Sequence, residues 1–300
     1  MTTRILKVAA AQYPLDQMAG FQAWTSKVSR WVADGAATGA CLLVFPEYGA
    51  IEMAGAAGPT VLADIKLTLA AVVEVQHEAS TVWSDLAARH RVHILAPSGP
   101  ERRGSAYVNA ARLYAPGGSV GVQDKLVMTP FERAWGITPG TTQRVFETAL
   151  GRIGIAICYD SEFPLLVRAM TEAGADLILV PACTEHETGY HRVRNACLAR
   201  ALESQVATVM SSTVGTSTWS AAVDHNTGAA GIFVPPDIAL STNGVLAQGT
   251  LDAPGWVTAT IDFARLSQLR TSGEMRNHAD WSRQAAAAPL SAAVEVEKLA

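Results

Sequence analysis

The sequence predicts an α/β fold built as a single domain. Apolar runs of strand length alternate with helical patterns along most of the chain. Some runs, such as Leu42–Phe45, are apolar without interruption, which is typical of strands covered on both faces. The 300-residue chain is 49% apolar and only 17% charged, so it can bury a large core. No low-complexity linker divides the chain, and we expect one domain over residues 1–280.

Ten strands and four main helices are expected. The strands lie at about residues 5–11, 41–46, 92–97, 107–114, 119–125, 153–158, 176–181, 206–212, 230–235 and 256–262. The first helix carries a core-facing stripe made of Phe21, Trp24, Val28, Trp31 and Val32. Further helices are expected over about 60–90, from Glu162 to Gly174 and over about 191–204. Residues 281–300 are expected to form an arm that could pack on a neighbouring subunit.

The segment Gly154–Asp160 predicts a buried strand that delivers Cys158 into a tight turn before a helix. Bulky and small residues alternate along it, so one face of the strand can be approached closely. A cysteine at a strand end, beside a helix N-terminus, has amide donors and a dipole that stabilise a thiolate. Cys158 is therefore a candidate nucleophile, although a lone cysteine on an apolar strand is more often a small core residue.

Glu47 follows the apolar run Leu42–Phe45 and Pro46, at the carboxyl end of the expected strand. Apolar walls at the mouth of a parallel sheet would raise the pKa of this carboxyl group toward the range of a general base. The competing interpretation is a solvated loop residue, which is the commoner fate of a single glutamate.

Lys125 and Glu132 belong to a third segment, which follows a hairpin with its turn at Pro116–Gly118. Lys125 ends the second strand, and Glu132 lies seven residues later in a loop that contains Pro130. A lysine at a strand end is usually a surface charge. Here it could instead place a fixed positive charge beside a developing oxyanion, and Glu132 could hold it or position water.

These residues together form a reagent set. Cys158 would attack, Glu47 would take its proton and return it to a leaving amine, and Lys125 would stabilise the oxyanion.

The chain resembles the carbon–nitrogen hydrolases of the nitrilase superfamily, whose catalytic Glu, Lys and Cys occur in this order. The match rests on three motifs: Phe45-Pro-Glu47, Asp124-Lys125 and Ile157-Cys158-Tyr-Asp160. Similarity continues at Val8–Gln12, Arg194–Gln205, Gly231–Pro235 and Gly255–Asp262, so that it covers about residues 4–270. Two segments, Lys125–Glu132 and Gly189–Arg194, are most similar to a poorly characterised amidase branch. Some members of that branch are fused to an acetyltransferase domain.

The resemblance implies a four-layer α-β-β-α sandwich of two mixed sheets. It also implies a homodimer or a higher homo-oligomer, packed through the helix after Cys158 and the helix around 191–204. The implied reaction converts a small amide to a carboxylate and ammonia through a thioester. In that reaction Glu47, Lys125, Cys158 and Glu132 are catalytic, and the Tyr159 backbone N–H joins Lys125 at the oxyanion.

The substrate is less well defined by these motifs. Relatives that act on N-carbamoyl amino acids carry arginines where this chain has Ser161-Glu162, so we expect a neutral or cationic amide. Tyr159-Asp160 stands where nitrilases often have Trp-Glu, which favours an amide over a nitrile. The candidate substrate-binding residues are Tyr159, Phe131, Trp135, Glu162, Cys183 and Thr184, and the pocket walls among them could equally be ordinary core residues.

Other functions are less consistent with the sequence. Cys183, His186, His191 and Cys197 match no zinc spacing, and we expect no metal and no cofactor. A Cys158–His pair, as in proteases, would leave Glu47 and Lys125 unexplained. A non-catalytic binding protein of the same fold and a nitrilase remain open as alternatives.

Several partners and compartments are not expected. The formal net charge of −4 and the scattered Lys and Arg give no footprint for nucleic acid. No apolar run is long enough for a membrane span or a signal peptide. The four cysteines show no disulfide spacing, so we expect free thiols and a cytoplasmic location.

Overall fold

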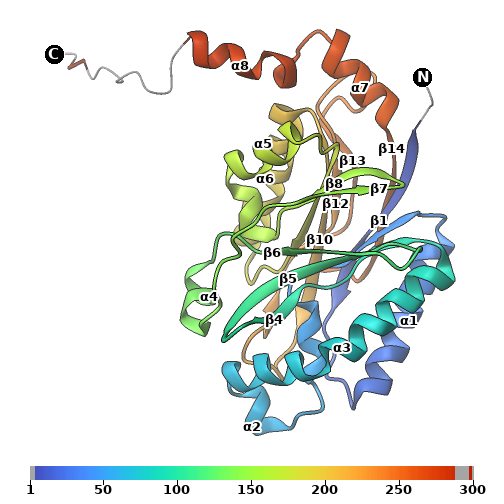
Figure 1. Cartoon of the computed structure of the whole chain (residues 1–300), viewed down its shortest axis with the longest axis vertical. Coiled ribbons are helices and arrows are strands. Elements are labelled where there is room, and N and C mark those ends of the chain that lie inside the picture. The colour runs from blue at the N-terminus through green and yellow to red at the C-terminus, as the bar shows by residue number, and fades with distance from the viewer. Residues whose placement is uncertain (1–3, 288–296, 299–300) are drawn as a thin grey trace.

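Two mixed β-sheets lie between helices in the computed structural model, which describes residues 4–287 and 297–298 (Figure 1). Hydrogen bonds connect all fourteen strands of the described chain, because the last residues of β1 (Ile5–Pro14) also pair with β10 (Ala207–Thr216) and thereby link the two sheets. The expected α/β fold with mixed sheets is confirmed.

The first sheet is centred on β1, which runs parallel to β2 and antiparallel to β14. Strands β3, β5, β4 and β6 extend it beyond β2. The other strands of this sheet are β2 (Leu42–Val44), β3 (His93–Leu95), β4 (Gly99–Arg103), β5 (Ala106–Tyr114), β6 (Val120–Asp124) and β14 (Gly255–Asp262).

The second sheet is centred on β10, with β9 parallel to it and β12 antiparallel. Strand β8 pairs in parallel with β9, and β7 closes that edge. The remaining strands are β7 (Val145–Thr148), β8 (Gly151–Ile155), β9 (Leu177–Ala182), β11 (His225–Asn226), β12 (Gly231–Phe233) and β13 (Val245–Gln248).

Helices cover the outer face of each sheet (Figure 1). Helices α1 (Phe21–Ala37) and α3 (Ile65–His90) pack on the first sheet, and α5 (Pro164–Glu172) and α6 (Glu187–Ser204) pack on the second. The other helical elements are η1 (Gly49–Ala54), α2 (Pro59–Leu62), α4 (Pro130–Trp135), η2 (Cys158–Glu162), α7 (Phe263–Ser272) and α8 (Asn277–Ala287).

The alternation of side chains along β5 shows how the layers form. Ala111 and Leu113 join the core that contains residues of both sheets, whereas Tyr114 joins the core under α1 and α3. Asn109 has the parity of Ala111 and therefore points between the sheets, toward the interior where the site lies.

Several expected elements were placed wrongly. The strand expected over 153–158 ends at Ile155, and Cys158 begins the 3₁₀ turn η2 with φ of 45°. The helix expected over 60–90 is divided, since Asp64 caps a new helix by accepting from the amides of Lys66 and Leu67. The helix expected from residue 191 begins earlier, at Glu187.

The segment around Glu132 was expected to be a loop but contains the short helix α4. Pro130 stands at its start, where a missing amide hydrogen does no harm, and Thr129 and Glu132 form a reciprocal capping box. Strands β4, β7, β11 and β13 were not expected.

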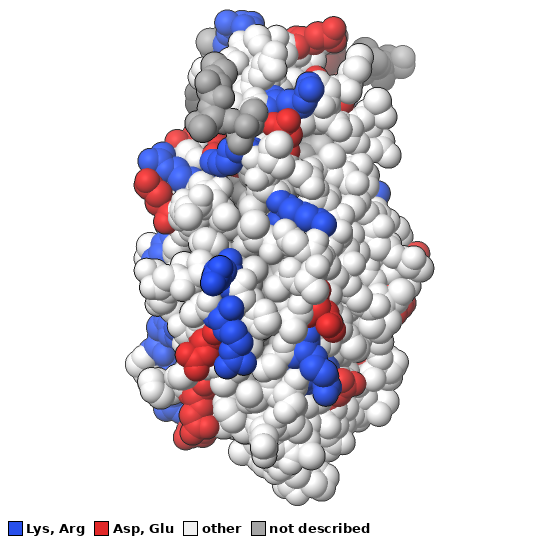
Figure 2. Space-filling model, turned by 90° about the vertical axis from the view of Figure 1, so that its right-hand side faces the viewer, with Lys and Arg blue, Asp and Glu red and all other residues white. Residues whose placement is uncertain are grey.

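The expected C-terminal arm over residues 281–300 lies mostly outside the described residues. Residues 281–287 belong to α8, and the Arg168 guanidinium of α5 lies 4.5 Å from the centre of the Trp281 ring. Among the described helices, none is both long and apolar enough to cross a membrane. On the face that Figure 2 shows, Lys and Arg are interspersed with Asp and Glu.

Candidate active site

Four side chains from four segments meet at the carboxyl ends of the strands. Glu47 follows β2, Lys125 follows β6, Cys158 follows β8, and Glu132 lies on α4. All four are buried, with exposed fractions of 1% for Lys125, 2% for Glu47 and Glu132, and 6% for Cys158. The expected constellation is therefore a real cluster in space.

Lys125 is the centre of this cluster. Its ammonium nitrogen Nζ lies 2.7 Å from Oε1 of Glu47 and 2.7 Å from Oε2 of Glu132. Burial by itself lowers the pKa of Lys125, but the two carboxylates more than offset it and the pKa is raised. Lys125 is therefore a permanent positive charge at neutral pH.

Glu132 is the ionised partner of Lys125. Besides the ammonium, its carboxylate accepts from Tyr48 Oη at 2.8 Å, from Thr129 N at 2.9 Å and Oγ1 at 3.0 Å, and from Asn109 Nδ2 at 3.2 Å. Burial raises the pKa of this carboxyl group, but Lys125 and the other donors bring the net value below its usual range. Glu132 is therefore ionised at neutral pH, because its oxygens accept from several donors.

Glu47 has the opposite electrostatic balance. Its Oε1 accepts from Lys125 and from Asn109 Nδ2 at 2.9 Å, and its Oε2 accepts from the Cys183 amide at 3.2 Å. Burial raises the pKa of Glu47, and the attraction of Lys125 offsets this only in part. The pKa values of the two buried carboxyl groups are therefore displaced in opposite directions, upward for Glu47 and downward for Glu132.

Cys158 holds a neutral thiol at rest. Burial raises the pKa of this thiol well above its ordinary value, the nearby Glu47 carboxylate raises it further, and Lys125 opposes both. Its Sγ lies 3.9 Å from the Cys183 carbonyl oxygen, to which the thiol donates.

The expected stabilisation of a thiolate by an adjacent helix N-terminus is wrong. Helix α5 begins only at Pro164, and η2 intervenes between it and Cys158.

The expected substrate-binding residues are placed unequally. Cys183 touches both Glu47 and Cys158 through its backbone. Trp135 packs edge-on against Tyr48, with the ring centres 5.6 Å apart. Phe131, on the same short helix, is 64% exposed.

The other three have partners of their own. Tyr159 is half-buried and packs edge-on against Phe163. Thr184 donates its hydroxyl to the Thr227 carbonyl at 2.6 Å. Glu162 lies 3.4 Å from the Arg192 guanidinium, so its charge is partly offset.

Sequence reasoning missed three residues of the cluster: Tyr48, Ser98 and Asn109. Asn109 is fully buried and donates to both carboxylates, and Ser98 fixes it by donating from Oγ to its Oδ1 at 2.8 Å. An available signal was the position of Asn109 in an otherwise apolar stretch of β5 that faces the interior.

No metal site is found within residues 4–287 and 297–298, since no three His, Cys, Asp or Glu side chains gather suitably there. Of the rival zinc set, Cys197 is fully buried in α6, whereas the His186 and His191 side chains are 72% and 53% exposed.

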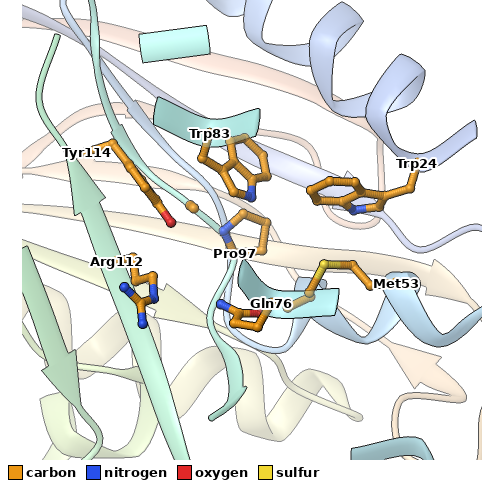
Figure 3. A pocket seen from close by; sticks show the side chains of 9 residues that line it. Trp24, Met53, Gln76, Trp83, Pro97, Arg112 and Tyr114 are labelled. Carbon is orange, nitrogen blue, oxygen red and sulfur yellow. The ribbon is translucent and has the colours of Figure 1, made fainter. Parts of the chain in front are cut away.

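A small cavity lies apart from the catalytic cluster, on the α1 and α3 side of the first sheet (Figure 3). Trp24, Trp83 and Tyr114 line it together with Gln76 and Arg112. Its volume of about 10 Å³ has room for one water molecule and not for a substrate.

Comparison with known proteins gives one consistent family. The model of a family described as carbon-nitrogen hydrolase matches residues 7–271. The probable hydrolase YhcX of Bacillus subtilis (strain 168) is 32% identical over 282 residues, which are 93% of this chain and 54% of that protein. The bifunctional nitrilase/nitrile hydratase NIT4A of Lupinus angustifolius is 30% identical over 172 residues, 54% of this chain and 49% of that protein.

Solved structures share the fold. A Glu-to-Gln mutant of the amidase from Nesterenkonia sp. AN1, with the acetamide moiety of fluoroacetamide added covalently at its active-site cysteine, superposes with a TM-score of 0.67. That match has 21% identity and covers 94% of this chain and 97% of the amidase. The chain spans about half the length of the two curated relatives named above.

Proposed function

Since the chain belongs to the carbon–nitrogen hydrolase family, we propose that it hydrolyses a small amide to a carboxylic acid and ammonia through a thioester on Cys158. The observation that carries this proposal is the buried cluster in which Lys125 bridges Glu47 and Glu132 beside the Cys158 thiol. A nucleophile, a base and a fixed positive charge are the three groups that acyl transfer requires.

The first step moves the thiol proton from Cys158 Sγ to Glu47. Oε1 of Glu47 already accepts from Lys125 and Asn109, whereas Oε2 accepts only from the Cys183 amide among the described residues. Oε2 therefore has a lone pair available for the proton. The raised pKa of Glu47 makes it a stronger base, whereas the raised pKa of the thiol opposes the transfer and the charge of Lys125 favours it.

The thiolate then attacks the amide carbon, and the C=O electron pair moves onto oxygen. Lys125 Nζ and the Tyr159 backbone N–H stabilise this oxyanion, and each such donor is typically worth roughly 3–4 kcal/mol at the transition state. Glu47 returns its proton to the nitrogen as the C–N bond breaks and ammonia leaves. Glu47 next deprotonates a water molecule, which adds to the thioester, and the acid departs as Cys158 regains its proton.

Burial at the cluster limits the substrate to a small molecule, because only 6% of Cys158 is exposed. A low dielectric also strengthens the interaction of Lys125 with the oxyanion. Glu162 supports the preference for a neutral or cationic amide, since it is the acidic residue that ends η2. Nitriles remain the second candidate class, because the Lupinus angustifolius relative is a bifunctional nitrilase/nitrile hydratase.

We propose further that the chain forms a homodimer through α5 and α6. Leu165 on α5 and Leu202 on α6 are large apolar side chains with exposed fractions of 72% and 47%. Exposed apolar residues on adjacent helices favour an interface. Sedimentation equilibrium of the wild type and of Leu165→Lys tests the homodimer. The introduced lysine charge is expected to disrupt the interface and produce monomers.

Ammonia release from a panel of neutral, acidic and basic amides and simple nitriles tests the function. The wild type is compared with Cys158→Ala, which should release none. Release by the wild type alone supports a Cys158-dependent hydrolase, and the active pool identifies the substrate class. If no compound of the panel releases ammonia and no alkylating reagent modifies the Cys158 thiol, a non-catalytic binding protein is favoured.

A further inference from the structure

Asp160 is a buried carboxylate that the proposed reaction does not use. It lies in η2, two residues after Cys158, and is 1% exposed. Its Oδ1 accepts from the Val127 amide at 2.7 Å, and the Leu126 amide lies 3.2 Å and 3.1 Å from its two oxygens. These two amides directly follow Lys125 in the chain.

The backbone around Lys125 is held from three sides. The Gly140 amide donates to the Lys125 carbonyl at 2.7 Å. Toward β5, the Lys125 amide donates to the Asn109 carbonyl at 2.8 Å. Toward η2, the Asp160 carboxylate holds the next two amides. Asp160 therefore links the turn that carries the nucleophile to the segment that carries the ammonium.

The rest of η2 is fixed independently of Asp160. The Ser161 hydroxyl donates to the Cys158 carbonyl at 2.6 Å, and the Arg200 guanidinium donates to the Ser161 carbonyl at 3.2 Å. These contacts stabilise the turn itself, in which Cys158 has a left-handed backbone. They do not reach the Lys125 segment.

A buried carboxylate at this position destabilises the fold unless its charge is compensated. Among the described residues, no Lys, Arg or His nitrogen lies within salt-bridge distance of Asp160, and burial raises its pKa to about 7. An asparagine would avoid the buried charge and could keep Oδ1 for both amides, but it would place an N–H donor where Oδ2 now accepts from the Leu126 amide at 3.1 Å. The geometry thus favours a group with acceptors at both positions.

We propose that Asp160 is a positioning residue, which fixes the Lys125 ammonium relative to the Cys158 thiol by holding the backbone at Leu126 and Val127. It touches neither the substrate nor the reacting atoms. Its effect on turnover rests on the proposed function, but its effect on the Cys158 thiol does not.

The test is the rate at which iodoacetamide alkylates Cys158 in the wild type and in Asp160→Asn, followed between pH 5 and 10. The modified peptide is quantified by mass spectrometry, because Cys41 is exposed and will be alkylated as well. We expect the rate at neutral pH to fall at least about tenfold and its inflection to move to higher pH, since the displaced ammonium no longer stabilises the thiolate.

The sign of this change discriminates between two causes. Loss of a nearby negative charge alone would lower the pKa of Cys158 and accelerate alkylation. Faster or unchanged alkylation in Asp160→Asn overturns the proposal.

The matched control is Asp124→Asn. Asp124 directly precedes Lys125, but its side chain binds Arg103 on the surface, at 2.7 Å and 3.2 Å. We expect this variant to be alkylated like the wild type, and an equal loss of rate in it would contradict the proposal. Thermal unfolding checks that both variants are folded. If Asp160→Asn does not fold, Asp160→Glu keeps the charge but displaces the oxygens, and the same slowing is expected.

The pH dependence supplies a second measurement. The charged groups that face Asp160 are Lys125 after β6, which lowers its pKa, and Glu47 after β2, which raises it. From α6, Arg200 binds the neighbouring Ser161 carbonyl. Protonation of Asp160 leaves a weaker acceptor for the two amides. The wild-type alkylation rate should therefore fall further below about pH 7 than that of Asp160→Asn, and parallel profiles would contradict the proposal.

Turnover separates this inference from the proposed function. With an active amide, Asp160→Asn should lower kcat at least about tenfold while KM stays within about twofold, because positioning acts on the transition state. If no amide is hydrolysed but alkylation depends on Asp160, the proposed function fails and the inference stands. If amides are hydrolysed and both kcat and alkylation are unchanged, the inference alone fails.

Discussion

Asn109 donates from Nδ2 to Oε1 of Glu47 at 2.9 Å, which leaves Oε2 as the less engaged oxygen of the proposed general base. The same nitrogen reaches Glu132 at 3.2 Å, so one amide group spaces the two buried carboxylates. Ser98 sets the orientation of the amide by donating to its oxygen. Oε2 of Glu47 accepts from the Cys183 amide at 3.2 Å.

Replacement of Asn109 tests this arrangement. In Asn109→Leu, Glu47 loses a donor to its charged form, so its pKa rises further and the acid limb of kcat/KM moves to higher pH. We expect kcat to fall about tenfold to a hundredfold, measured as ammonia release across pH. Tyr114→Phe on the same strand is the control, because Tyr114 faces α3 and binds Ser80. An unshifted acid limb would contradict the role assigned to Asn109.

Loss of the nucleophile or of the base should abolish turnover without unfolding. Cys158→Ala and Glu47→Gln each remove a group that forms or moves a bond, and we expect losses of at least about a thousandfold in kcat. Circular dichroism and the unfolding midpoint check that both variants are folded. Appreciable ammonia release by either variant would mean that the roles are wrongly assigned.

Substitution of Lys125 should affect both catalysis and stability. Lys125→Ala removes the oxyanion charge and leaves Glu47 and Glu132 buried without their cation, as the ammonium contacts both at 2.7 Å. Breaking a buried pair in this way costs roughly 3–5 kcal/mol in the free energy of unfolding. The double variant Lys125→Met/Glu132→Gln should recover part of that stability but no activity. Denaturant titration measures the first effect and ammonia release the second, and recovered activity would exclude Lys125 from the mechanism.

The stabilising effect of Glu132 should depend on pH. The pKa of Glu132 is lowered below its value of 4.5 in an unfolded chain, since Lys125 and the other donors outweigh burial. Its ionisation therefore stabilises the fold fully above pH 4.5, and this contribution is lost as the pH falls through the folded pKa. Urea unfolding between pH 3 and 7 should show a smaller acid loss in Glu132→Gln than in the wild type. Parallel curves would contradict the ionised state of Glu132.

The rate of hydrolysis should depend on the charge of the substrate, because Glu162 would repel an anionic amide. We expect neutral amides to react faster than acidic amides such as succinamate, and Glu162→Gln to narrow that ratio by several-fold. Arg192 lies 3.4 Å from Glu162, so Arg192→Gln should widen the ratio instead. Competition between a neutral and an acidic amide measures the ratio of their kcat/KM values. A wild type that prefers succinamate would contradict the expected pocket.

The α/β class and most of the strands could be predicted from the sequence, because burial on both faces leaves an unmistakable apolar run such as Leu42–Phe45. The ends of the elements could not. Cys158 was expected at the end of a strand, but hydrogen bonds within η2 hold it in a left-handed turn. Turn geometry of this kind depends on contacts such as that from Arg200 to Ser161, which is thirty-nine residues away in the chain.

The sequence by itself determined the family and predicted Glu47, Lys125 and Cys158 as the reagents, because a reaction requires particular functional groups and these stand in recognisable motifs. Only the tertiary structure decided how those groups are tuned. Asn109, Tyr48 and Asp160 act through hydrogen bonds to segments distant in the chain. The pKa of a buried group depends on which donors and charges surround it in space, and no local pattern of residues records that neighbourhood.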